Sequence, residues 1–127
     1  MLIVACVFAG LAALVHVYIF VLESLRWQDP ATRRTFGTTE ETAAVTQPLA
    51  YNQGFYNLFL AIGTGVGIAL LPSGRDPALA LLLFGLGSMV AAATVLITSD
   101  RSKARAALVQ ALFPGLALLS LLVWAVA

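Results

Sequence analysis

Residues 1–27 read MLIVACVFAGLAALVHVYIFVLESLRW, and the first 15 of them carry no charged side chain. A helix needs roughly 20 mostly apolar residues to cross the hydrocarbon core of a bilayer, and this run is long enough. The chain as a whole has the same character, because 61% of its 127 residues are hydrophobic and only 10% are charged. A soluble domain of this length could not bury so much apolar surface. The sequence therefore predicts an integral membrane protein.

Apolar segments of membrane-spanning length occur four times, at about residues 2–25, 50–71, 78–99 and 105–126. The first lacks the basic start and the small-residue cleavage site of a signal peptide, so we expect it to remain in the protein. The predicted fold is all-α: a polytopic membrane protein whose single domain, residues 1–127, forms an antiparallel bundle of four transmembrane helices.

The basic residues are distributed unevenly among the connections between these segments. The second connection holds only Arg75, whereas the first and third hold the remaining six: Arg26, Arg33, Arg34, Arg101, Lys103 and Arg105. Connections rich in Lys and Arg stay on the cytoplasmic side of a membrane. We therefore expect the first and third loops in the cytoplasm and both termini outside.

The long first connection carries signals for short helices of its own. Residues 29–30, Asp-Pro, suit an N-cap followed by proline at the first helical position, and Gly37 suits a helix end, which predicts a helix over residues 30–36. The TTEE sequence from Thr38 fits a capping box for a second short helix running toward Pro48. This connection is either a strap on the membrane surface or a lid over a cytoplasm-facing cavity.

Two ionisable residues lie inside the first span. On a helix, His16, Glu23 and Trp27 are seven and eleven positions apart and fall within about 20° of one line. Glu23 is predicted near the cytoplasmic interface, and His16 about 10 Å deeper. An ionisable pair at membrane depth marks a functional site by default, so His16 and Glu23 are the candidate catalytic residues. The simpler alternative is that Glu23 reaches out to Arg26.

The second span opens with a run of polar side chains, from which we take Asn52, Gln53, Tyr56 and Asn57 as candidate substrate-binding residues. Asn52 and Gln53 are expected level with Glu23, and Asn57 deeper, near the level of the histidine. Amides also hold membrane helices together without binding any ligand, and tyrosines belong to interfacial belts, so a structural role stays open for these residues.

The fourth span adds Gln110 as a further candidate binding residue. Pro114 lies four positions later and removes the hydrogen bond to the carbonyl of Gln110, which leaves a free carbonyl beside a polar side chain. These intramembrane polar groups are all predicted in the cytoplasmic half of spans one, two and four. Because isolated polar groups are costly in lipid, we expect them to converge in one polar pocket.

Four stretches in this order resemble a known family: HVYIFVLESLRW (16–27), FGTT (36–39), NQGFYNLFLA (52–61) and VQALFPGLALL (109–119). The resemblance is to an uncharacterised family of small four-span bacterial membrane proteins, domain of unknown function 1304, and it runs from Met1 to Ala127. Ala111 stands where that family usually has glycine. The resemblance implies four helices in a membrane, here expected to be the bacterial inner (plasma) membrane, but it implies no activity.

Three function classes fit the predicted pocket. The first is an enzyme that binds a small lipophilic molecule and isomerises or cyclises it by acid and base chemistry at His16 and Glu23. The second is a small proton-coupled transporter, and the third is an accessory structural subunit of a membrane complex. No Ser/His/Asp arrangement or metal-ligand spacing is present to support hydrolysis.

Cofactors and partners follow from composition. We expect no metal and no cofactor, with haem on His16 as the one alternative, since an apolar pocket with one axial histidine can hold it. A net charge of +1 without a basic face argues against nucleic acid. The expected partners are membrane lipid and a small lipophilic ligand, and homo-oligomerisation is left open.

Overall fold

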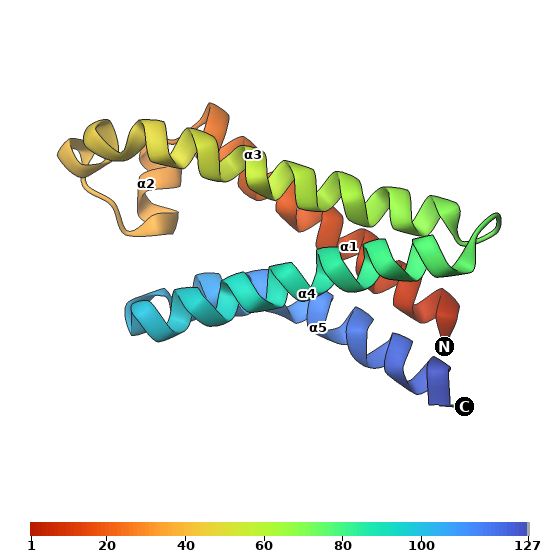
Figure 1. The fold of residues 1–127 in the computed structure, drawn as a ribbon. Helices are drawn as coiled ribbons and strands as arrows, with labels where there is room; N and C mark the ends of the chain where they lie inside the picture. Colours follow the sequence, from red (N-terminus) through yellow and green to blue (C-terminus); the bar gives the residue numbers. More distant parts are fainter. Residues whose placement is uncertain (127) are drawn as a thin grey trace.

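The fold consists of helices joined by short connections, with no strand among residues 1–126, the part of the chain that this computed structural model describes (Figure 1). Four segments are long and apolar enough to cross a membrane, as the sequence predicts. The elements in chain order are α1 (Leu2–Phe20), a π turn (Val21–Leu25), α2 (Pro30–Phe36), α3 (Glu40–Leu70), α4 (Arg75–Ser99), a 3-10 turn (Arg101–Lys103) and α5 (Ala104–Val126).

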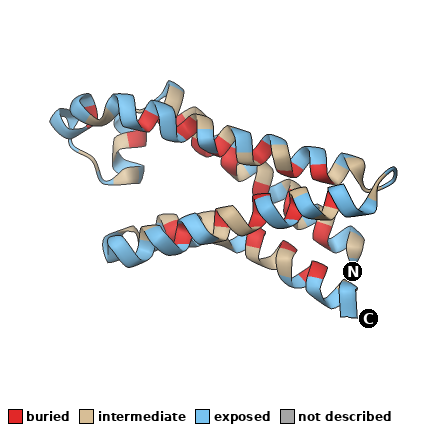
Figure 2. Ribbon diagram, viewed as in Figure 1, coloured by how far each residue is buried: buried red, intermediate tan, exposed pale blue. Residues whose placement is uncertain are grey.

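The four long helices form a square bundle. Helix α1 packs against α3 and α5, α4 packs against the same two helices, and α1 and α4 face each other across the diagonal. The start of α1 and the end of α5 lie at one end of the bundle, and the first and third connections lie at the other (Figure 1). Buried residues follow the inward faces and exposed ones the outside, as expected for helices surrounded by lipid (Figure 2).

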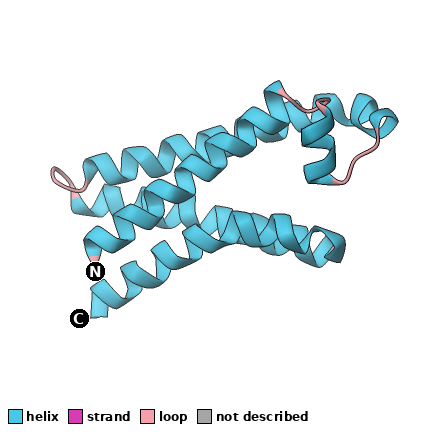
Figure 3. Cartoon of the chain, turned by 180° about the vertical axis from the view of Figure 1, so that it is seen from behind, coloured by secondary structure: helices cyan, strands magenta, loops and turns pink. Residues whose placement is uncertain are grey.

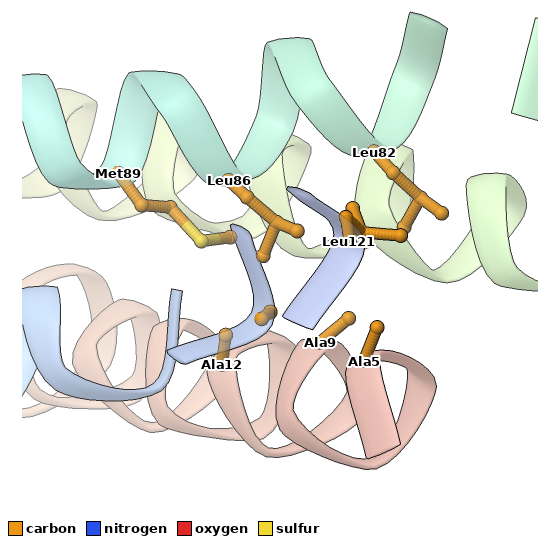
Figure 4. Packing of buried hydrophobic residues seen from close by; sticks show 8 residues of the cluster. Ala5, Ala9, Ala12, Leu82, Leu86, Met89 and Leu121 are labelled. Carbon is orange, nitrogen blue, oxygen red and sulfur yellow. The ribbon is translucent and has the colours of Figure 1, made fainter. Parts of the chain in front are cut away.

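The cluster of buried hydrophobic residues that forms the core lies toward the end where the first span begins. Alanines at positions 5, 9 and 12 of α1 are at most 2% exposed and face larger side chains from α4 and α5 (Figure 4). Small residues let membrane helices approach closely, while the longer side chains fill the space between them. The members of this cluster are Ala5, Ala9, Ala12, Leu82, Leu86, Met89, Ala117 and Leu121.

Toward the other end the helices separate into two pairs, α1 with α3 and α4 with α5 (Figures 1 and 3). The short helix α2 projects from the α1–α3 pair toward the α4–α5 pair. A contact joins α2 to the third connection, since Lys103 Nζ donates a hydrogen bond to the carbonyl of Phe36. A cation is favourable at this position because the last carbonyls of a helix carry partial negative charge. The first and third connections therefore meet on the same side of the bundle.

The prediction for residues 30–36 is confirmed, with Asp29 in extended conformation before the helix and Gly37 at φ +64° after it. The second predicted helix is wrong in two respects. Thr39 rather than Thr38 caps it, accepting a hydrogen bond from the Thr42 amide at 3.1 Å, and the helix continues through Pro48 into the membrane span. Pro48 is exposed, so water or lipid headgroups can solvate the carbonyl that its ring leaves unbonded.

Candidate functional site

The first span ends in an irregular turn that contains Glu23. The π turn over Val21–Leu25 widens the helix for one turn, a feature frequent at functional sites, and Arg26 then leaves helical geometry at φ −131°. Trp27 therefore lies beyond the helix, and the prediction that it shares a helical stripe with Glu23 is wrong. Its ring packs 5.1 Å from that of Phe36, and its indole N–H donates to Thr46 Oγ1 at 3.2 Å.

A buried hydrogen bond links Glu23 to the second span. Asn57 Nδ2 donates to Glu23 Oε2 at 2.9 Å and also approaches the carbonyl of Gln53 at 3.2 Å. Both side chains are buried, with exposures of 9% for Glu23 and 8% for Asn57. Asn57 is thus level with Glu23 rather than deeper, which corrects the depth expected from the sequence. One carboxyl oxygen is held by the amide, and no residue among 1–126 donates to the other.

The π turn at the end of the first span lies very close to α3 beside this pair, because Gly54 has no side chain. A Cβ placed at Gly54 would lie 3.0 Å from the backbone nitrogen of Ser24 and 3.1 Å from Glu23 Cβ, and it would collide with the Ser24 hydroxyl. That hydroxyl donates to the carbonyl of Tyr51 at 2.8 Å. Sequence reasoning missed Gly54 and Ser24. The signal was present, since a glycine in the middle of a polar helical run marks a close backbone approach.

The other predicted catalytic residue is deeper in the bundle. His16 is only 1% exposed, and its Nδ1 lies 2.9 Å from the carbonyl oxygen of Ala12. Because a carbonyl can only accept, Nδ1 carries the proton in this arrangement. In the neutral ring Nε2 then has a free lone pair, and no residue in the described chain is hydrogen-bonded to it. His16 and Glu23 are both on the buried side of the first span, as a shared site requires.

The remaining predicted binding residues lie elsewhere. Asn52, Gln53 and Tyr56 are exposed on the outside of α3, although the Gln53 backbone carbonyl contacts Asn57. Gln110 is half-buried on α5, and Pro114, four residues later, is buried inside that helix. The structure thus brings together Glu23, Asn57 and the Gln53 carbonyl, and it leaves three predicted side chains facing outward.

Replacing Asn57 by leucine should destabilise the protein by about 2 kcal/mol, because the Glu23 carboxyl would stay buried without its donor. Thermal unfolding in mild detergent measures the change. Asn52→Leu is the matched control, since this amide is exposed on the same helix and should shift stability by less than about 0.5 kcal/mol. Equal effects of the two substitutions would show that the Glu23 hydrogen bond contributes nothing.

Comparison with known proteins agrees with the resemblance in the sequence. The model of the family described as "Protein of unknown function (DUF1304)" matches residues 10–122. No curated protein and no solved structure matched the chain. The match covers the second and third membrane spans in full and most of the first and fourth, and it includes His16, Glu23, Asn57 and Gln110. The chain therefore belongs to the DUF1304 family of membrane proteins, for which no activity is assigned.

Proposed function

We propose that the chain is a membrane-embedded isomerase or cyclase, which binds a small lipophilic molecule between its helices and rearranges it by proton transfer at His16 and Glu23. The observation that carries the proposal is the buried Glu23 carboxyl, held in a π turn by Asn57 with one oxygen unoccupied. A purely structural carboxyl at this depth would be costly, and such groups are rare in membrane helices unless they serve a function.

The chemistry needs one proton acceptor and one donor. Neutral His16 accepts through Nε2 a proton from a carbon of the substrate next to a carbonyl or a double bond, and protonated Glu23 delivers a proton to the new position. His16 gains one proton and Glu23 loses one, so the reaction consumes no co-reactant, and exchange of protons with water resets both residues before the next turnover. Asn57 orients the carboxyl through its amide and can direct its own carbonyl oxygen toward a substrate hydroxyl.

Access to the pair is proposed from the end that holds the first and third connections. There the α1–α3 and α4–α5 pairs diverge, and α2 hangs between them (Figures 1 and 3). Glu23 lies near this end of the first span, and the half-buried Gln110 comes from the opposite pair of helices. A ligand entering along the diverging helices would meet Glu23 before the deeper His16.

An isomerase produces a molecule with the mass of its substrate. Membranes containing the wild-type chain or His16→Ala should therefore differ, on chromatography with mass detection, in the ratio of two compounds of equal mass. The variant should still be folded by circular dichroism. An identical profile for the two chains, with equal protein amounts, would contradict an activity that depends on His16.

A second candidate function is that of an accessory subunit in a membrane complex. The observation that favours it is the polar outer face of α3, where Asn52, Gln53 and Tyr56 are exposed and free to bond to a neighbouring protein. This function predicts that Asn52→Leu or Gln53→Leu releases a co-purifying protein without any effect on small molecules. The enzyme proposal predicts no such loss.

The proposed orientation places the first and third loops in the cytoplasm of a bacterium and both termini outside, in accordance with the excess of basic residues in those loops. Cysteine labelling checks this in a Cys6→Ala background. Ser73→Cys, in the exposed second loop, should react with an impermeant maleimide on intact spheroplasts, whereas Ser102→Cys should react only after lysis. The reverse pattern would invert the topology.

A further inference from the structure

A surface hollow of about 400 Å³ lies between the end of α2 and the start of α3, away from Glu23 and His16. Its lining contains two arginines and two threonines. The lining residues are Pro30, Arg33, Arg34, Gly37, Thr38 and Thr39.

Positive charge at this hollow is only partly compensated. Arg33 Nε is buried and has no hydrogen-bond partner in the described chain, and its Nη1 lies 3.5 Å from a carboxyl oxygen of Glu40, whose side chain is 86% exposed. An exposed pair of this length contributes little. Arg34 is exposed and forms no ion pair with residues 1–126. A third cation is adjacent, because Lys103 Nζ lies 3.5 Å from the point where a Gly37 Cβ would be.

The hollow lies at the level where a membrane span ends. Lys103 follows the last residue of α4, Ser99, by four positions, and it contacts the carbonyl of Phe36 just before the hollow. This level is that of lipid headgroups, whose phosphates are the most abundant anions there. Guanidinium groups bind phosphate with paired hydrogen bonds, and threonine hydroxyls add further donors.

We propose that this hollow is a binding site for the phosphate of an anionic phospholipid headgroup, formed by Arg33, Arg34 and Lys103 around Gly37. The site is separate from the proposed function of Glu23 and His16 and does not depend on it. Bound lipid would strengthen the contact between α2 and the third connection, because its phosphate would bind the arginines of α2 and Lys103 at the same time. Lys103 already donates a hydrogen bond to the carbonyl of Phe36 at this place.

The test is native mass spectrometry of delipidated protein in detergent, titrated with phosphatidylglycerol and, separately, with phosphatidylcholine. We expect tighter binding of phosphatidylglycerol, weakened about fivefold by Arg34→Gln and about fivefold more by adding Lys103→Gln. Arg26→Gln is the control, because this arginine belongs to the same loop and is already paired with Asp29 at 2.8 Å. Arg34 is exposed, so its replacement should leave the fold intact.

Equal affinity for the two lipids would overturn the proposal. So would an equal loss of phosphatidylglycerol affinity in Arg26→Gln and Arg34→Gln. Inorganic phosphate is titrated in a third arm. If it displaces phosphatidylglycerol at millimolar concentration with the same dependence on Arg34, a soluble phosphate rather than a lipid is the occupant, which would overturn the lipid assignment. If it does not displace the lipid, the assignment is upheld.

Discussion

Gly54→Ala should destabilise the bundle by about 3 kcal/mol, a large effect for the addition of a single methyl group. The added Cβ would meet the backbone nitrogen of Ser24 at 3.0 Å and Glu23 Cβ at 3.1 Å, and it would overlap the Ser24 hydroxyl oxygen. Two of these three neighbours belong to or adjoin the backbone and cannot rotate away, so α1 and α3 must move apart. The separation should also lengthen the Asn57 to Glu23 hydrogen bond.

Gly63→Ala is the matched control, because Gly63 lies on the same helix and a Cβ there meets no atom within 4 Å. Alanine should be neutral or slightly stabilising at that position, by up to about 1 kcal/mol, since it favours helix more than glycine does. Thermal unfolding of the three proteins in one detergent compares them. If the Gly54→Ala and Gly63→Ala variants unfolded at the same temperature, the close approach of the first span and α3 at Gly54 would be refuted.

Glu23→Gln should lower the proposed isomerisation rate by about 10²–10⁴-fold, the range by which a positioned acid or base accelerates proton transfer. Glutamine keeps the shape and can still accept the hydrogen bond from Asn57 through its oxygen, so the fold should be retained. The rate is measured as conversion between the two compounds of equal mass in washed membranes.

Glu41→Gln is the matched control for a glutamate-to-glutamine substitution, since this glutamate is exposed at the start of α3 and its replacement should leave the rate unchanged. If the Glu23→Gln protein were as active as the wild type, Glu23 would not be the proton donor of the reaction. A Glu23→Gln protein that fails to fold would instead assign the carboxyl a structural role and support the accessory-subunit alternative.

The large features of this fold could be predicted from hydropathy alone, because lipid demands long apolar helices and these have a plain signature. The short helix before Gly37 could also be predicted, since proline at its start and glycine at its end act locally. The continuation of α3 through Pro48 could not, because it depends on whether the unbonded carbonyl faces solvent, a matter of tertiary position.

The candidate site was predictable in part. The burial of His16, Glu23 and Asn57 agrees with the cost of leaving such groups in lipid. The positions of Glu23 and Asn57 along the bundle axis were harder to predict. The π turn widens the first span at Glu23, which changes the position of this side chain relative to Asn57 on α3. The outward position of Asn52 had no sequence signal, since an amide on a helix serves equally well toward a pocket or toward a neighbouring protein.

The central claim is that the Glu23–Asn57 pair and His16 form a ligand site, and the most direct test is native mass spectrometry, with an absorbance spectrum, on protein extracted in its own lipids. Wild-type protein should carry a small lipophilic molecule that is absent from His16→Ala, while Arg34→Gln should retain it. A visible absorbance band lost in His16→Ala would identify haem instead and contradict the proton-transfer chemistry. Wild-type and His16→Ala proteins of identical ligand content would contradict the claim that a ligand binds at His16.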